Sequence, residues 1–155
     1  MRLCGWTAGW AVQRGMTLSD KPMAYALLRA ALGVNFAGHG LIRIYNGVGV
    51  FAQGTAEHLL KSPLPHGVVL GFGYVIPWVE AVLGVLLILG LGTRVALVVG
   101  AVFMMALTVG VTSNQQWDVA GEQLLYSLIF FALLFLREWN GLSVDGWLRD
   151  GRVRA

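Results

Sequence analysis

The sequence is short of charged residues. Only 12% of its 155 residues are Asp, Glu, Lys or Arg, whereas 57% are hydrophobic. A soluble domain is closer to half apolar and a quarter charged. This deficit indicates a chain surrounded by lipid rather than by water, and the length allows one domain.

Cysteine is almost absent, and cofactor motifs are missing. The single cysteine, Cys4, excludes a disulfide within one chain and a cysteine-based zinc cluster. There is also no GxGxxG or CxxCH stretch. We therefore expect no metal, and no cofactor encoded by a motif. The N-terminal stretch lacks the long apolar segment of a signal peptide, and Met16 or Met23 could be the real start.

Long apolar runs are present instead. A membrane helix needs about 20 mostly apolar residues. Four segments fit, at about 23–45, 68–90, 94–112 and 119–137. We predict an all-α fold, a four-transmembrane-helix bundle over 22–138. A cytoplasmic N-terminal tail at 1–21 and a cytoplasmic C-terminal tail at 139–155 flank it.

The loop at 46–67 is the only long one. Its apolar residues recur at helical spacing and are followed by two prolines. These residues are Phe51, Ala52, Ala56, Leu59 and Leu60, then Pro63 and Pro65. The pattern predicts a short amphipathic helix on the outer face, either a lid over a site or a surface packing element.

Positive residues predict the orientation. They gather in the two tails and at Arg94, whereas the other loops carry only Lys61. Both termini are therefore expected in the cytoplasm of a bacterial or archaeal cell, with the bundle in the cytoplasmic membrane. The basic tails indicate contact with anionic lipid and not with nucleic acid.

Glu80 stands in the middle of the second apolar run. A carboxylate there is costly unless it is paired. Arg29 of the first run is the predicted partner in an intramembrane ion pair, since its long side chain can reach toward mid-membrane. Pro77 leaves the carbonyl of Gly73 without its helical donor, close to the carboxylate. The pair is either functional or a purely structural salt bridge.

A second polar group is predicted nearer the outer face. His39, Arg43 and Glu122 would converge there, and Phe36 and Trp78 could hold a ring beside them. Each polar residue also has an ordinary explanation. The histidine could be a hydrogen-bonded core residue, the arginine a lipid anchor, and the glutamate a partner for the dipole of its helix.

Several stretches resemble the DoxX family of small four-helix membrane proteins. They are LLRAALGVNFAGHGLIRI (27–44), PWVEAVLGVLLILGLGTR (77–94), and EQLLYSLIFFALLF (122–135) followed by NGLSVD (140–145). Arg29, Gly33, His39, Gly40 and Glu80 carry the likeness, which covers about 24–148. One departure is Arg43, where relatives often have lysine. The resemblance implies a four-helix bundle. Some relatives are subunits of thiosulfate:quinone oxidoreductases, others are linked to redox or oxidative-stress complexes, and many have no assigned activity.

Two classes of function follow from these features. The first is a quinone-interacting subunit of a membrane oxidoreductase complex, with His39, Arg43, Glu122, Phe36 and Trp78 as the ligand site. If the protein is an enzyme, it is one only as such a subunit, with its electron donor among the other subunits. The second is a non-catalytic accessory subunit that docks a larger membrane complex. A solute or proton pathway is a third reading, and it would require a homo-oligomer.

Overall fold

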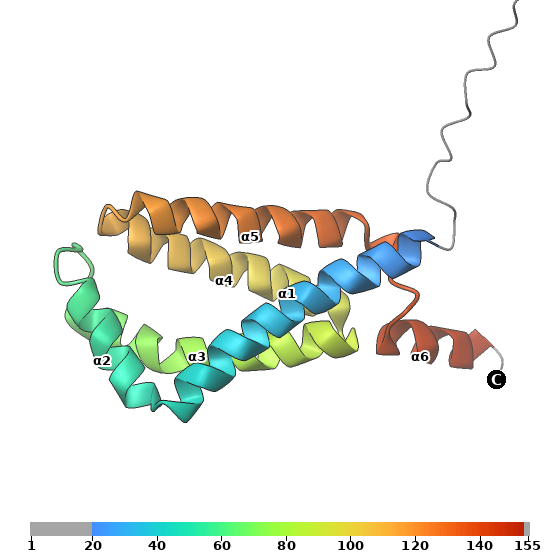
Figure 1. Cartoon of the computed structure of the whole chain (residues 1–155), viewed down its shortest axis with the longest axis horizontal. Coiled ribbons are helices and arrows are strands. Elements are labelled where there is room, and N and C mark those ends of the chain that lie inside the picture. Colours follow the sequence, from blue (N-terminus) through green and yellow to red (C-terminus); the bar gives the residue numbers. More distant parts are fainter. Residues whose placement is uncertain (1–19, 154–155) are drawn as a thin grey trace, which may run out of the picture.

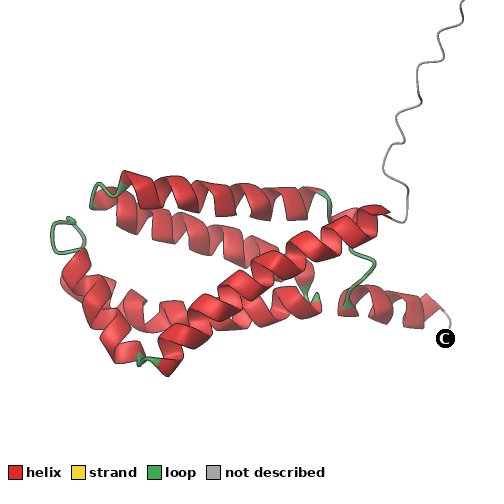
Figure 2. Cartoon of the chain, in the orientation of Figure 1, coloured by secondary structure: helices red, strands yellow, loops and turns green. Residues whose placement is uncertain are grey.

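The computed structural model describes residues 20–153, and this part of the chain is helical with no strand (Figure 2). The order is α1 (Asp20–Tyr45), α2 (Val48–His58), α3 (His66–Leu89), α4 (Thr93–Ser113), α5 (Trp117–Phe135), a 3-10 turn η1 (Arg137–Trp139) and α6 (Val144–Val153). The all-α prediction is therefore confirmed. Cys4 and most of the predicted tail at 1–21 lie outside the described residues.

Three helices, rather than the predicted four, are long and apolar enough to cross a membrane. Within the described residues they are α3, α4 and α5. The fourth long helix, α1, has 26 residues and lies where the first span was predicted. It is too polar to qualify, because Arg29, His39 and Arg43 interrupt its apolar run. The apolar helices, whose outward side chains include exposed Val82 and Leu128, mark an integral membrane protein.

The long helices form two pairs (Figure 1). Helix α1 packs along α3, and α5 packs along α4. At the α1–α3 crossing, a Cβ on Gly33 would lie 2.8 Å from the backbone nitrogen of Ile88, and one on Gly40 would lie 2.6 Å from the carbonyl oxygen of Pro77. These close approaches fix the antiparallel register, so that Glu80 is level with about residue 40 of α1.

The second pair is held by aromatic packing onto a small residue. Gly100 of α4 lies against the ring of Phe130, which is almost fully buried. Leu97 and Leu133 are fully buried in the same core cluster. Gly100 therefore allows a close contact between α4 and α5 at this point.

Helix α2 lies in the long loop, as predicted, and packs on α3. Its buried residues are Ala52 and Ala56, and Ala52 sits against Gly73. The helix ends at His58, before the apolar residues at 59 and 60 that were predicted to belong to it. Its amphipathic character is not confirmed, because the exposed face carries Val50 at 71% exposure as well as polar residues.

The two ends of the bundle differ. The outer end holds α2 and the α4–α5 turn, and the inner end holds the α3–α4 turn and α6. In the segment predicted as a cytoplasmic tail at 139–155, the described residues include α6, which begins beside the α3–α4 turn. The backbone N–H of Asp145 donates to the carbonyl of Gly90 at 3.1 Å. That the inner end faces the cytoplasm stays a prediction.

Candidate functional site

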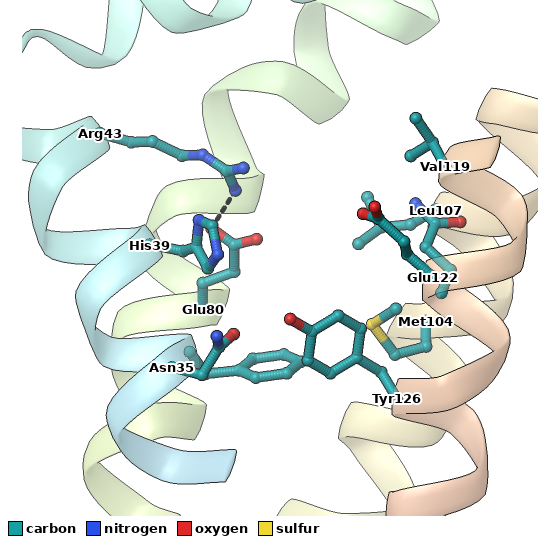
Figure 3. Close-up of a pocket in the computed structure, with 11 residues that line it drawn as sticks. Asn35, His39, Arg43, Glu80, Met104, Leu107, Val119, Glu122 and Tyr126 are labelled. Carbon is teal, nitrogen blue, oxygen red and sulfur yellow. Dashed lines mark hydrogen bonds and ion pairs between the residues drawn. The ribbon is translucent and has the colours of Figure 1, made fainter. Parts of the chain in front are cut away.

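The Glu80 carboxylate pairs with Arg43 and not with Arg29. One guanidinium nitrogen of Arg43 donates to Oε2 of Glu80, and this contact is also an ion pair (Figure 3). The Glu80 side chain is 9% exposed and that of Arg43 is 29% exposed. The predicted Arg29–Glu80 ion pair is therefore wrong.

The register of α1 against α3 explains why Glu80 pairs with Arg43 and not with Arg29. Glu80 is level with about residue 40 of α1, given the glycine contacts at that crossing. At about 1.5 Å per residue, Arg43 is about 5 Å from that level along the helix. Arg29 is about 16 Å away in the other direction, too far for one side chain to bridge.

Arg29 instead joins α1 to the inner end. Its guanidinium donates to Oδ1 of Asn140 at 2.7 Å and to the carbonyl of Leu142 at 2.9 Å. The amide of Asn140 donates in turn to the hydroxyl of Thr93 at 2.9 Å. Arg29, Asn140 and Thr93 are all at most 3% exposed. Together with Asp145 they form the inner latch, which ties α1, α4 and α6 together.

Asp145 contributes the negatively charged member of the inner latch. Its carboxylate accepts the backbone N–H groups of Gly92 at 2.8 Å and Thr93 at 2.7 Å, at the start of α4. Burial of this carboxyl raises its pKa, but the hydrogen bonds from Thr93 and Gly92 and the charge of Arg149 outweigh that effect. The pKa of Asp145 therefore lies below its usual value.

A polar cavity of about 170 Å³ lies between the two helix pairs, toward the outer end. Its lining residues are Asn35, Phe36, His39, Arg43, Glu80, Met104, Leu107, Val119, Glu122, Gln123 and Tyr126. Side chains from α1 and α3 face those from α4 and α5 across it (Figure 3). Four of the five residues predicted for a ligand site are thus brought together: Phe36, His39, Arg43 and Glu122.

Trp78, the fifth predicted residue, is not part of this cavity. It is 55% exposed and lies in an apolar groove between α3 and α4. Two residues along a helix correspond to a rotation of about 200°, so Trp78 and Glu80 point to opposite sides of α3.

Two residues of α5, Gln123 and Tyr126, were missed by the sequence analysis. Tyr126 lies four residues after Glu122, on the same side of the helix, so this spacing could have revealed it. The ring of Phe36 meets that of Tyr126 edge-on at 6.1 Å and that of Phe130 at 5.4 Å. The rings of Phe36 and Tyr126 line the inner side of the cavity, and Phe130 packs against Phe36.

A larger, mainly apolar cavity of about 570 Å³ adjoins the polar one. The two cavities share lining residues, which are Arg43, Glu80, Leu107, Val119 and Gln123. Phe51 and Leu59 from the α2 region, Phe72 from α3 and Ala106 from α4 enclose the rest. The guanidinium of Arg43 also lies 4.5 Å from the centre of the Phe51 ring, a cation–π contact.

The joined cavities offer a defined chemistry. At the polar end are hydrogen-bond donors (His39, Arg43, Tyr126) and two carboxylates (Glu80, Glu122). Such groups can bind a polar ring and exchange protons with it. Among residues 20–153, no cluster of three or more His, Cys, Asp or Glu side chains is placed to hold a metal ion.

Comparison with models of known protein families yields a match. The family model described as DoxX matches residues 24–113, which is more than half of the chain and runs from α1 to the end of α4. No curated protein and no solved structure matches the chain.

Proposed function

The chain belongs to the DoxX family of membrane proteins, and we propose that it acts there as a quinone-interacting subunit of a membrane redox complex. One observation carries the proposal: a small polar cavity adjoins a larger apolar one, and the two share five lining residues. A quinone has the same division, with a ring bearing two carbonyl groups on an apolar tail. Ligand sites of this kind are mostly apolar, with a few placed polar groups.

The polar cavity suits the quinone ring. His39, Arg43 and Tyr126 carry N–H or O–H donors that can reach a carbonyl oxygen of a bound ring. Phe36 offers an apolar surface at the inner side of the same space. The arginine is already held by Glu80, so it can meet the ligand without losing further side-chain freedom.

The apolar cavity suits the quinone tail. Its volume of about 570 Å³ falls in the usual range for ligand pockets, and its walls come from α2, α3 and α4. Within the proposal, α2 is a lid that keeps this space closed on the outer side. This gives the loop helix a role beyond packing.

Proton transfer falls to this chain and electron transfer to a partner. Reduction of a quinone to a quinol takes up two electrons and two protons. Glu80, Glu122 and His39 can accept and release protons at the cavity wall. The sequence encodes no redox cofactor motif. Another subunit of the complex would therefore donate the electrons when the quinone is reduced.

Calorimetry on the purified chain in mild detergent tests the proposal. We expect the wild type to bind ubiquinone or menaquinone, and His39→Ala or Glu122→Gln to weaken binding about tenfold, which is the worth of one strong hydrogen bond. Trp78→Ala is the matched control, because this side chain lies outside both cavities. Absence of quinone binding by the wild type would refute the proposal.

A second candidate is a non-catalytic accessory subunit that docks a larger complex. It is favoured by the Arg43–Glu80 ion pair, because this pair gives the buried Glu80 carboxylate a partner within the chain and no ligand is needed for that. The exchanged variant Arg43→Glu with Glu80→Arg separates the two functions. An accessory subunit should regain both folding and co-purification of its partners. A quinone-binding subunit should regain folding while quinone affinity stays reduced.

We further propose that the inner end faces the cytoplasm of a bacterial or archaeal cell. The described arginines outside the long helices, Arg137, Arg149 and Arg152, lie at the inner end with Arg94, whereas Lys61 is at the outer end. A fluorescent reporter that matures only in the cytoplasm, fused after residue 155, should be bright. A dark but expressed fusion contradicts this orientation.

A further inference from the structure

An arginine-lined pocket at the inner end adjoins an apolar groove between α3 and α4. The pocket has a volume of about 250 Å³, and its charged lining residues are Arg94, Arg137, Arg149 and Asp145. The groove has a volume of about 460 Å³ and an entirely apolar lining that includes Trp78, Val82 and Val99. Gly92 and Val95 line both spaces, so the pocket and the groove are neighbours.

We propose that this composite site binds one anionic phospholipid, with its phosphate in the pocket and an acyl chain in the groove. Three guanidinium groups face one carboxylate in the pocket, so the local charge favours an anion. The adjoining groove gives the anion an apolar continuation, which a soluble phosphate lacks.

The pocket is built by the inner latch. The guanidinium of Arg149 donates to the carbonyl oxygens of Asn140 at 3.2 Å and Asp145 at 3.3 Å, and these bonds hold it at the rim. The Asp145 carboxylate is turned toward the N–H groups of Gly92 and Thr93. The N–H groups at the start of α4 are therefore already bonded to this carboxylate, and the arginines are the groups left to bind a phosphate.

The groove is about as long as the hydrocarbon region of one lipid leaflet is thick. Trp78 lies eleven residues before the end of α3 at Leu89, which corresponds to about 16 Å along the helix. Half of a typical hydrocarbon core is about 15 Å. Val82 and Val95 are 57% and 67% exposed, so an acyl chain lying here would cover apolar side chains beneath the headgroup.

This site is separate from the proposed quinone site. None of the residues that line the arginine pocket or the groove also lines the two outer cavities. If the inner end faces the cytoplasm, the pocket opens to a leaflet in which anionic lipids attract basic residues at the surface.

Native mass spectrometry of the full chain in mild detergent tests the proposal. We expect retention of phosphatidylglycerol but not of phosphatidylcholine. Arg94→Gln with Arg137→Gln should lower phosphatidylglycerol affinity about thirtyfold, as expected for two basic residues near a membrane surface. Lys21→Gln with Lys61→Gln is the control with the same net charge. Equal retention of the two lipids, or equal affinity of the two double variants, overturns the proposal.

A second variant tests the acyl-chain half of the site. Val95→Trp should fill the groove and reduce phosphatidylglycerol retention severalfold while leaving the arginines in place. Inorganic phosphate, titrated in parallel, should bind much more weakly than the lipid. If phosphate binds as tightly as the lipid and Val95→Trp has no effect, the site is one for a soluble anion. Thermal unfolding should show all variants folded, since Arg94, Arg137 and Val95 are exposed.

Discussion

Gly40→Ala tests the α1–α3 crossing that positions the polar cavity. A Cβ at this position would be nearest to the backbone nitrogen of Ala81, and it would lie 2.6 Å from the carbonyl oxygen of Pro77 and 2.8 Å from Cα of Ala81. Ordinary Cβ contacts begin near 3.4 Å, so α3 would have to retreat by about 1 Å. All three obstacles are backbone atoms, which cannot turn aside as a side chain can.

The magnitude follows from a matched control on the same helix. At Gly38 a Cβ meets nothing within 4 Å. Both substitutions gain about 1 kcal/mol of helix propensity, and this gain cancels in the comparison. The remaining difference is the steric cost of overpacking, about 1–3 kcal/mol, with Gly40→Ala the less stable.

Unfolding of the two variants in mixed micelles, by titration with a denaturing detergent, measures this difference. Quinone binding is the second readout, because Gly40 follows His39 and faces Ala81, the neighbour of Glu80. Retreat of α3 should pull Glu80 away from Arg43 and weaken binding as well. Equal stability of the two variants would refute the close contact and the register deduced from it.

The inner latch gives two more predictions. Arg29→Gln removes the charged donor to Asn140 and Leu142, and it should lower the free energy of unfolding by about 3 kcal/mol in the same detergent titration. An unchanged free energy of unfolding would contradict the role of the inner latch. The pKa of Asp145 is lowered in the folded state, so its contribution to stability is complete above its unfolded pKa of about 3.9 and is lost as the pH falls through the folded value. The protection factors of the Gly92 and Thr93 amides, which correct for the intrinsic pH dependence of hydrogen exchange, should therefore fall in acid. Asp145→Asn should give low protection factors at every pH, and a variant that keeps the wild-type profile would exclude this carboxylate as the cause.

The sequence predicted the long helices well because apolar runs and turns are local signals. The boundaries of α3, α4 and α5 lie within about two residues of the predicted ones. The number of spans was overestimated because α1 is long enough to cross a membrane, although its polar residues make it too polar to qualify as a span. The partner of Glu80 was wrong for a different reason. Helix register depends on which glycines meet across a crossing, as Gly40 and Pro77 do, and spacing within one helix does not show that.

The candidate site was predicted in part. His39, Arg43 and Glu122 are polar residues in apolar surroundings, so each stood out from its neighbours. Trp78 was predicted as an aromatic residue that could hold a ring, although a rotation of about 200° from Glu80 turns it to the other side of the helix. Tyr126 is an amphipathic residue of a kind common in membrane helices, and its role depends on the ring of Phe36, which comes from another helix.

The position of Asn140 has a consequence for the order of biosynthesis. Arg29 emerges from the ribosome more than one hundred residues before the two groups that accept its hydrogen bonds. Until the segment after α5 is made, the guanidinium at the start of the bundle can only be solvated by water or lipid headgroups. The inner end can therefore close only after residues 140–142 have been synthesised, and a ribosome stalled before residue 140 should hold a nascent chain whose first helix is still unanchored there.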